Sequence, residues 1–211
     1  MKVNYQKKLE EILQRLPAQG KKPVLALHCC CAPCSSYVLE YLADYFEMKL
    51  VFFNPNIAPE SEYVRRLEEL RDLLAQLNMP GISLVEGAYD PQVFYARVKG
   101  LEHEPEGAGR CRGCFKLRLE ELARQAVALG ADYFTTTLSI SPHKDAQALN
   151  EIGAVLEQTY RVPYLYSDFK KKDGFKRSLA LSSLFGLYRQ DYCGCVFSKH
   201  AGEKGEVHKI F

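Results

Sequence analysis

Apolar residues recur at two different periods along the chain, and the order of these periods predicts an α/β protein. Short apolar runs with the length and composition of buried strands cover residues 23–27, 49–53, 81–85 and 132–137. Apolar positions at helical spacing cover residues 5–16, 35–46, 60–78, 115–129 and 146–156, the last continuing towards residue 160. Because strands and helices alternate, we expect a parallel, doubly wound sheet with helices on both faces.

One stretch of the chain shows neither the strand-like nor the helical spacing of apolar residues. Residues 89–110 contain two prolines and three glycines, which predicts a short helix followed by an exposed loop. We find no internal repeat, low-complexity tract or second-domain linker in the sequence. We therefore expect residues 1–211 to form a single α/β domain.

Composition narrows the class of protein further. Of the 211 residues, 47% are hydrophobic and 26% are charged, which is enough for one globular core. The 28 Lys and Arg against 26 Asp and Glu give a net charge of +2, which by itself favours neither a polyanion nor an acidic ligand. No aliphatic run approaches the about 20 residues of a membrane span, and the charged start has no signal-peptide core. We expect a cytoplasmic protein with no membrane partner.

Eight cysteines occur in three packets, at residues 29–34, 111–114 and 193–195. In a reducing compartment we expect no structural disulfides, so metal or redox chemistry is the leading interpretation. Each packet can place two thiolates on one metal ion. The first packet follows a predicted strand and begins a helix, where backbone N–H groups and the helix dipole favour anionic sulfur.

The spacing of the packets excludes a local zinc ribbon. Separations of 77 and 79 residues lie between the packets, whereas the two Cys pairs of a ribbon are about 15–20 residues apart. A single CxxC is as often structural as functional, but three converging packets supply more thiolates than the four used by one zinc ion or one iron–sulfur cluster. A cluster with a neighbouring metal, or a cluster with a redox dithiol, would use the surplus.

Other signatures are absent. Gly107 and Gly109 are followed by Arg112 where a dinucleotide-binding GxGxxG motif needs its third glycine, and there is no GxxxxGK[ST] motif. The zinc-deaminase pattern fails because His28 is followed by Cys30 where a glutamate is required. A thioredoxin-like motif would stand alone after one strand and need no second and third pair. Electrons would therefore come from an external donor.

Three motifs in order resemble one known family. Residues 28–34 (HCCCAPC), 111–114 (CRGC) and 186–195 (GLYRQDYCGC) are similar to the epoxyqueuosine reductase QueH family, as are residues 135–144 and 168–174. The resemblance implies a cobalamin-independent oxidoreductase that converts epoxyqueuosine to queuosine in the anticodon loop of tRNA, the last step of queuosine biosynthesis. It also implies a Rossmann-like sheet of the adenine-nucleotide hydrolase-like type.

The resemblance carries a set of site residues with it. It implies a 4Fe-4S cluster, an adjacent iron or other metal ion, and an electron-donor protein or reductant. The cysteines implied as ligands are Cys30, Cys31, Cys34, Cys111, Cys114, Cys193 and Cys195. Their division between cluster and second metal is open, because some members of the family are expected to have Asp in place of Cys34. We expect Cys29 to be a core residue.

Reduction of an epoxide to an alkene consumes two electrons and two protons and releases water, so a proton donor is needed. Candidates near the motifs are Tyr192, Asp168 and His143, with His28 as a further one. A tyrosine beside a cysteine pair is more often a packing residue, and a histidine at a strand end is as often structural.

A basic segment gives the only polyanion signal. Residues 160–200 hold eight Lys and Arg and three Asp, a net charge of +5. We expect contacts with tRNA phosphates from Lys170, Lys171, Lys172, Lys176 and Arg177. Phe169, Phe175 and Tyr188 could stack on an unpaired base, although such aromatics are more often core residues. A solvated loop is the alternative for the lysine run.

Two other functions compete with the reductase. One is a zinc-stabilised tRNA- or nucleotide-binding module without redox activity, which would be colourless. The other is an ATP-using relative of the tRNA-thiolating enzymes, which requires a Gly- and Ser-rich phosphate loop where residues 30–34 are rich in thiols. Iron, sulfide and zinc contents of an anaerobic preparation distinguish these functions.

Overall fold

The structure is a computed structural model that describes residues 3–16 and 20–203. The strands are β1 (Val24–His28), β2 (Glu47–Phe52), β3 (Ile82–Glu86) and β4 (Tyr133–Thr136). The helices are α1 (Tyr5–Arg15), α2 (Ala32–Leu42), α3 (Glu60–Leu77), α4 (Pro91–Val98), α5 (Gly109–Ala128), α6 (Ala146–Tyr160), α7 (Gly174–Leu184) and α8 (Val196–Glu203). A 3-10 helix, η1 (Thr137–Ile140), directly follows β4.

The four strands form one parallel sheet in the order β3-β2-β1-β4. A parallel bridge between Phe134 and Tyr164 adds a short contact beyond β4. The chain runs outward from β1 through β2 to β3 and then returns to pair β4 with the other side of β1. This reversal makes the carboxyl ends of β1 and β4 the topological switch point, where ligands bind in open α/β sheets.

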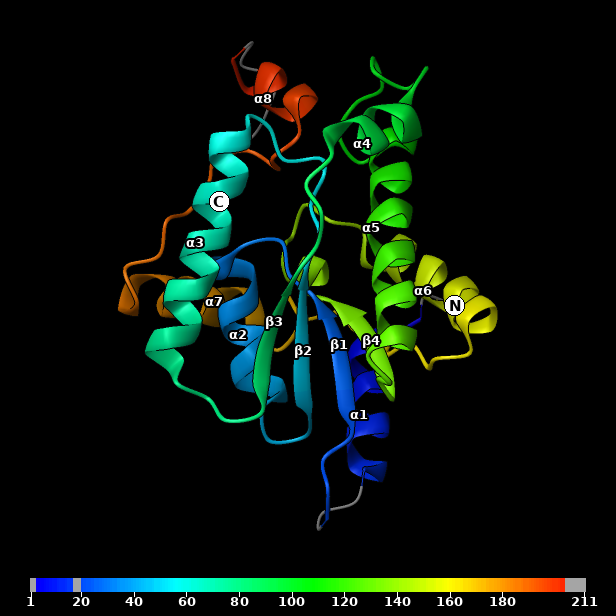
Figure 1. Ribbon diagram of the computed structural model, residues 1–211, viewed down its shortest axis with the longest axis vertical. Coiled ribbons are helices and arrows are strands. Elements are labelled where there is room, and N and C mark those ends of the chain that lie inside the picture. The colour runs from blue at the N-terminus through cyan, green and yellow to red at the C-terminus, as the bar shows by residue number, and fades with distance from the viewer. Residues whose placement is uncertain (1–2, 17–19, 204–211) are drawn as a thin grey trace.

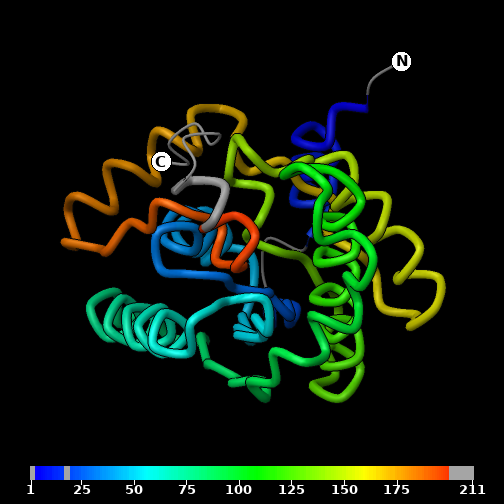
Figure 2. Tube along the Cα trace, turned by 90° about the horizontal axis from the view of Figure 1, so that it is seen from above, coloured from blue at the N-terminus to red at the C-terminus, as the bar shows by residue number. Residues whose placement is uncertain are grey.

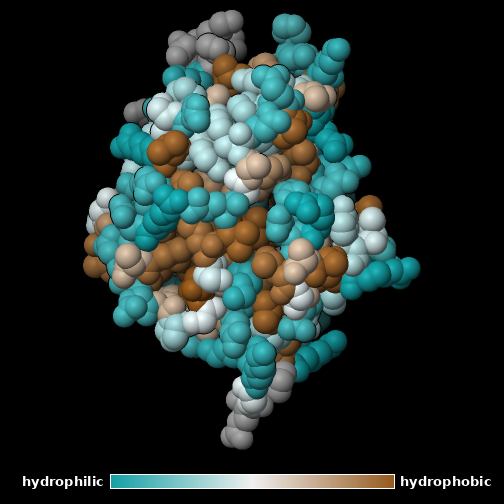
Figure 3. All heavy atoms as spheres, viewed as in Figure 1, coloured by the Kyte–Doolittle hydropathy of each residue, from teal (hydrophilic) through white to brown (hydrophobic). Residues whose placement is uncertain are grey.

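Helices cover both faces of the sheet. In Figure 1, α2, α3 and α7 lie on one side and α5 and α6 on the other, while α4 and α8 lie beyond the carboxyl ends of the strands. The core between these layers is aliphatic and aromatic, with Leu25, Leu27, Leu50 and Phe134 fully buried. The edge strand β3 is only partly buried, and hydrophobic residues gather at the centre of this face of the molecule (Figure 3).

The structure confirms the predicted α/β class and all four predicted strands, but the two helices that follow the first cysteines and carry the second packet begin earlier than predicted. Helix α2 begins at Ala32 and α5 at Gly109, so Cys34, Cys111 and Cys114 lie in the first two turns of these helices, whereas Cys31 is the N-cap of α2. The start of α5 is fixed by the Glu104 carboxylate, which accepts a hydrogen bond from the Arg110 backbone N–H at 2.9 Å. Helix α7 is not among the predicted elements, and it begins directly after the lysine run. Within the described ranges, no helix has the length and apolar character needed to cross a membrane.

Candidate metal centre

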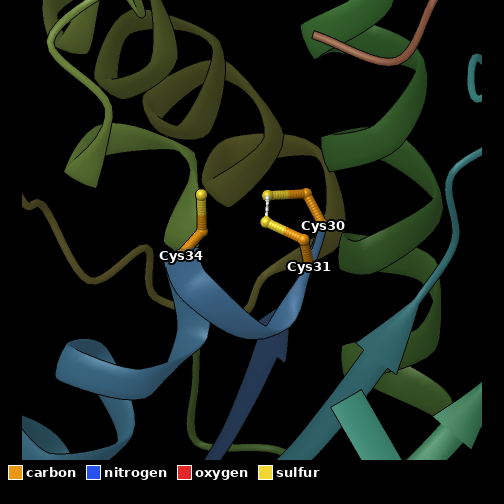
Figure 4. A group of neighbouring side chains, drawn as sticks. All are labelled: Cys30, Cys31 and Cys34. Atoms are coloured by element: carbon orange, nitrogen blue, oxygen red, sulfur yellow. Dashed lines mark hydrogen bonds between the residues drawn. The ribbon is translucent and has the colours of Figure 1, made fainter. Parts of the chain in front are cut away.

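Three cysteines converge where β1 passes into α2. The Sγ atoms of Cys30, Cys31 and Cys34 all lie within 4.8 Å of one another, and those of Cys30 and Cys31 are 3.7 Å apart. Figure 4 shows the three side chains pointing towards one another from the loop and from the first turn of the helix. All three are buried, with exposed fractions of 8%, 1% and 6%. Among the described residues this is the one group of three potential ligands found so close together.

The local backbone explains this convergence. Cys31 is the N-cap of α2, in an extended conformation with φ −172° and ψ 164°, and Pro33 stands in the first helical turn, where its missing N–H costs nothing. The carbonyl of Cys31 accepts hydrogen bonds from the N–H and the hydroxyl of Ser35. The Asn54 side-chain amide fixes the loop between β1 and α2 by donating a hydrogen bond to the Cys29 carbonyl at 2.9 Å. The three thiols are therefore held before any ligand arrives.

The electrostatics of this group favour one thiolate. Hydrogen bonds from Cys30 and Cys34 hold the pKa of Cys31 well below its usual value, against the effect of burial, and the positive charge of Arg66 acts in the same direction. The Gln190 amide also donates to Cys31 Sγ at 3.1 Å. The hydrogen bond with Cys31 raises the pKa of Cys30, and the hydrogen bonds with Cys30 and Cys31 raise the pKa of Cys34. Anionic sulfur is thus available in a site shielded from water.

The other two packets meet beside this group. Cys111 and Cys114 lie in the first turns of α5, and Cys114 packs with Cys195, Phe94 and Val98 in a small apolar cluster. Burial raises the pKa of Cys114 to about 11 and that of Cys195 to about 12. Burial also raises the pKa of Cys111, whose Sγ accepts a hydrogen bond from the Gly107 N–H at 3.2 Å.

Lys144 links the third cysteine packet to the loop before α5. Its ammonium donates to Cys193 Sγ at 2.8 Å and forms an ion pair with Glu106 at 3.1 Å. Burial acts to lower the pKa of Lys144, but the negative charges of Cys193 and Glu106 outweigh it and raise the pKa. The lysine is therefore a buried, fixed positive charge next to a cysteine.

Arg66 holds the segment that carries the last two cysteines. Its side chain is 2% exposed, bonds Glu62 through Nε at 2.7 Å, and donates to the carbonyls of Tyr192 and Cys193. Gly194 follows with φ +114°, and its carbonyl accepts a hydrogen bond from the Ala58 N–H at 2.8 Å. Seen from above the strand ends, this C-terminal segment, coloured orange to red, passes over the blue coils of α2 (Figure 2).

A small cavity of about 20 Å³ lies between the packets. Its lining residues are Cys30, Cys34, Arg66, Arg118, Leu138, Ser141, Lys144, Gln190 and Cys193. Cysteines 163 residues apart in sequence thus border one space at the switch point of the sheet. Thiolate donors flanked by buried cations fit an iron–sulfur centre, which is bound by cysteines and carries negative charge.

Comparison with known proteins identifies the family. The family model described as epoxyqueuosine reductase QueH matches residues 25–201. This chain belongs to the QueH family. Its relatives include the epoxyqueuosine reductase QueH of Staphylococcus epidermidis, 43% identical over 202 residues, a match that covers 93% of this chain and 85% of that protein. The QueH of Thermotoga maritima is 35% identical over 175 residues, covering 82% of this chain and 88% of that protein.

A solved structure shows the same fold. The U34-tRNA thiolase NcsA from Methanococcus maripaludis, with its [4Fe-4S] cluster, aligns with a TM-score of 0.53 and 14% sequence identity. The alignment covers 95% of this chain and 70% of the thiolase chain. This likeness confirms the predicted fold class of the QueH chain.

The candidate proton donors lie in different surroundings. Tyr192 is buried and its hydroxyl donates to the Ala58 carbonyl at 2.7 Å; burial raises its pKa to about 12. Asp168 forms an ion pair with Lys170 at 2.7 Å. His143 is exposed in the turn before α6. His28 is fully buried between Thr136 and the Phe53 carbonyl, and burial lowers its pKa to about 3, so it remains neutral.

The candidate tRNA-binding residues divide into two sets. Lys170, Lys171 and Lys172 line a cavity of about 1010 Å³ that is also bordered by the N-terminal turns of α1 and α6. Lys172 pairs with Glu10, and Lys170 donates to the carbonyls of Ser139 and Lys144. Lys176 and Arg177 lie on α7, and Arg177 forms a bidentate pair with Glu40.

The predicted aromatic and core residues also have clear places. Phe169 is a core residue, 1% exposed, and Tyr188 lies under the Arg65 guanidinium at 3.3 Å from the ring centroid. Phe175 is partly buried in α7. Cys29 is fully buried in the main core, where its thiol donates to the Leu27 carbonyl at 3.6 Å. All eight cysteines are free thiols.

Sequence reasoning missed four buried polar residues of this site. They are Arg66, Arg118, Lys144 and Gln190. Two of them leave a trace in the sequence, because Arg66 and Arg118 stand on the apolar stripes of α3 and α5, one turn from Leu70 and Leu122. A charge on a buried stripe must be neutralised by a partner, and that signal could have located both arginines.

Proposed function

We propose that this chain is a cytoplasmic, cobalamin-independent oxidoreductase that reduces epoxyqueuosine to queuosine in tRNA. The observation that carries the proposal is the buried group of Cys30, Cys31 and Cys34, with ligand atoms within 4.8 Å of one another, in a chain of the QueH family. Relatives that match this chain over most of their own length are named epoxyqueuosine reductase. No carboxylate is among the described residues that line the small cavity, and cysteine sulfurs are the usual ligands of iron–sulfur centres, which transfer electrons.

Seven cysteines are proposed as ligands. Cys30, Cys31 and Cys34 would hold a 4Fe-4S cluster, and Cys111, Cys114, Cys193 and Cys195 would hold an adjacent metal ion or share in both sites. When bound, the cluster supplies electrons one at a time and an open metal position supplies a Lewis acid for the epoxide oxygen. An external donor, such as a reductase protein, provides the electrons.

The chain's own residues prepare the site. Arg66 and Gln190 orient Cys31 and the last cysteine pair, while Lys144 fixes a positive charge beside Cys193. Their burial excludes water from the sulfur atoms, which limits side reactions of the reduced centre. Negative charge that develops on the departing epoxide oxygen is favoured by this positive surrounding.

Two protons must reach the epoxide oxygen, which leaves as water. Asp168, which borders the large cavity, and the exposed His143 are the proposed donors, because each is more exposed to solvent than Tyr192. Tyr192 is proposed as a donor only through the opening of its hydrogen bond to the Ala58 carbonyl. Overall, the C–O bonds to one oxygen break, a C=C bond forms, and the oxygen leaves as water.

The tRNA is proposed to lie over the large cavity. Lys170, Lys171 and Lys172 line it, Lys176 and Arg177 extend the positive surface along α7, and phosphate groups are their natural ligands. Lys144 borders both this cavity and the smaller one beside the cysteines. A nucleotide that enters the large cavity would therefore approach the cysteines past Lys144.

The test is an anaerobic preparation of the full chain. Iron, acid-labile sulfide and zinc are measured on one sample, and conversion of epoxyqueuosine tRNA is followed by nucleoside mass spectrometry with dithionite as electron donor. We expect a brown protein with about four irons and four sulfides per cluster that forms queuosine. A colourless zinc protein with no conversion would contradict the proposal and favour a zinc-stabilised tRNA-binding module.

A further inference from the structure

Arg118 has a buried guanidinium group in which two of the three nitrogens lack a hydrogen-bond partner among the described residues. It lies on α5 with an exposed fraction of 2%, and its Nη1 donates to Asn54 Oδ1 at 3.1 Å. Its Nε and Nη2 have no hydrogen-bond partner among the described residues. Leaving two donors of a charged group unmet in a protein interior is costly, and such groups in native proteins usually have a ligand or a function.

The side chains around Arg118 in the small cavity include three cysteines and, among the described residues, no carboxylate. It borders the small cavity together with Cys30, Cys34 and Cys193. Burial acts to lower its pKa, but the charges of Cys114, Cys193 and Cys30 outweigh burial and raise the pKa. Within the described chain, no ion pair with a carboxylate is formed by this arginine, because its one side-chain partner is the amide of Asn54. The groups that raise its pKa are therefore cysteines from all three packets.

Arg66 shows what a purely structural arginine looks like in the same cavity. Its Nε bonds Glu62, its Nη1 bonds the Cys193 carbonyl and its Nη2 bonds the Tyr192 carbonyl. Each nitrogen of Arg66 is thus used by the protein. Arg118 differs because two of its three nitrogens are left for something that is not part of the polypeptide.

We propose that Arg118 is a positioning residue whose remaining N–H groups donate to sulfur atoms of the iron–sulfur centre and whose charge sets its reduction potential. This inference rests on the proposed function. Reduction adds one electron from the donor to the centre, with no bond broken and no proton taken up. A fixed positive charge and N–H···S hydrogen bonds both stabilise the more negative, reduced state and raise the potential.

The test is a potentiometric titration of the loaded protein without tRNA. Wild type, Arg118→Met, Arg118→Gln and Arg118→Lys are compared, with Arg124→Met as a control on the exposed face of the same helix, where the side chain is 59% exposed. We expect the neutral variants to have an at least tenfold lower ratio of reduced to oxidised cluster at the wild-type midpoint, which is about 59 mV for a one-electron couple. Arg118→Lys retains the charge and should shift less, and Arg124→Met should not shift.

Several results would decide the matter. Neutral variants that load the cluster and keep the wild-type midpoint would overturn the role of Arg118. Loss of the cluster from both neutral variants, with retention in Arg118→Lys, would support it, because the charge then determines whether the centre is held. Folded variants that all lose the cluster, Arg118→Lys included, would overturn the electrostatic role. A wild-type protein with no iron would instead refute the proposed function, so the two failures are distinguishable.

Discussion

Lys144 Nζ donates a hydrogen bond to Cys193 Sγ at 2.8 Å, although the two residues are 49 positions apart. The same ammonium pairs with Glu106, so one buried cation joins the loop before α5, the turn before α6 and the last cysteine packet. Three segments that contribute to the site are thus tied by one side chain. The stability of the protein and the order of the site should both depend on it.

We predict that Lys144→Met destabilises the protein by about 3 kcal/mol, because it leaves Glu106 and Cys193 without their buried counter-ion. The measurement is urea unfolding of the metal-free protein under reducing conditions. The double variant Lys144→Met with Glu106→Gln should recover part of the loss, since the orphaned carboxylate is removed. Equal losses in the single and double variants would show that the ion pair does not carry the effect.

We predict that Cys111→Ser and Cys193→Ser lower bound iron and abolish reductase activity, whereas Cys29→Ser retains both. A serine hydroxyl is a harder, less acidic ligand than a thiol and holds iron weakly at a cysteine position. Cys29 points into the core and donates only to the Leu27 carbonyl, a bond that a hydroxyl can replace. Iron is measured after anaerobic reconstitution, with circular dichroism as the control for folding. Loss of iron from Cys29→Ser alone would reverse this division of the cysteines.

Much of this architecture follows from the sequence, because strands and amphipathic helices are encoded by local periodicity. The carboxyl end of β1 could be named as a site because the first packet directly follows an apolar run. Helix α7 was missed because its sequence, GFKRSLALSSL, mixes serine with glycine and begins after a left-handed Asp173. The roles of Arg66 and Lys144 could not be predicted, since their sulfur-bearing partner segment lies 127 and 49 residues away.

We predict that neutralising Lys171 and Lys172 together, as Lys171→Gln with Lys172→Gln, weakens tRNA binding and flattens its salt dependence. Both side chains are exposed and line the large cavity, so they can contact phosphates and displace the counterions bound there. Because neither is buried, their substitution leaves the core unchanged. Each lost phosphate contact should lower the slope of log K against log salt by about 0.7 to 0.9. Fluorescence titration at several salt concentrations gives the slope, and the cluster absorption should be unchanged.

The matched variant for this prediction is Lys176→Gln on α7, which tests whether the second set also contacts tRNA. We expect a smaller change than for the cavity pair, because Lys176 does not line the cavity. An unchanged slope in the Lys171 and Lys172 variant, with a lower slope for Lys176→Gln, would move the interface from the cavity to α7.

We predict that ionisation of Tyr166 lowers the free energy of unfolding at alkaline pH. Burial raises the pKa of Tyr166 to about 12, with the hydrogen bond to Glu157 and the charge of that carboxylate acting in the same direction. The unfolded chain ionises this phenol near pH 10, about its ordinary value, so between pH 10 and 12 the unfolded state loses the proton first and the free energy of unfolding falls. Tyr166→Phe should show a shallower fall over this window in urea unfolding at fixed pH values. An identical pH slope would contradict the raised pKa.

The last prediction concerns the glycine between the final two cysteines. Gly194 has φ +114°, and an added Cβ would lie 3.0 Å from Arg66 Nη1 and 3.1 Å from Ile57 Cγ1. Gly194→Ala therefore combines backbone strain with displacement of the arginine that holds the Cys193 carbonyl. We expect a loss of about 1–3 kcal/mol in stability and a lower content of bound metal. Gly130→Ala is the control, because Gly130 also has a positive φ, of +61°, but nothing within 4 Å of its added Cβ. That variant should lose about 1–2 kcal/mol from backbone strain alone and bind metal as the wild type does. If both variants kept their metal, the geometry of Gly194 would matter for folding and not for the site.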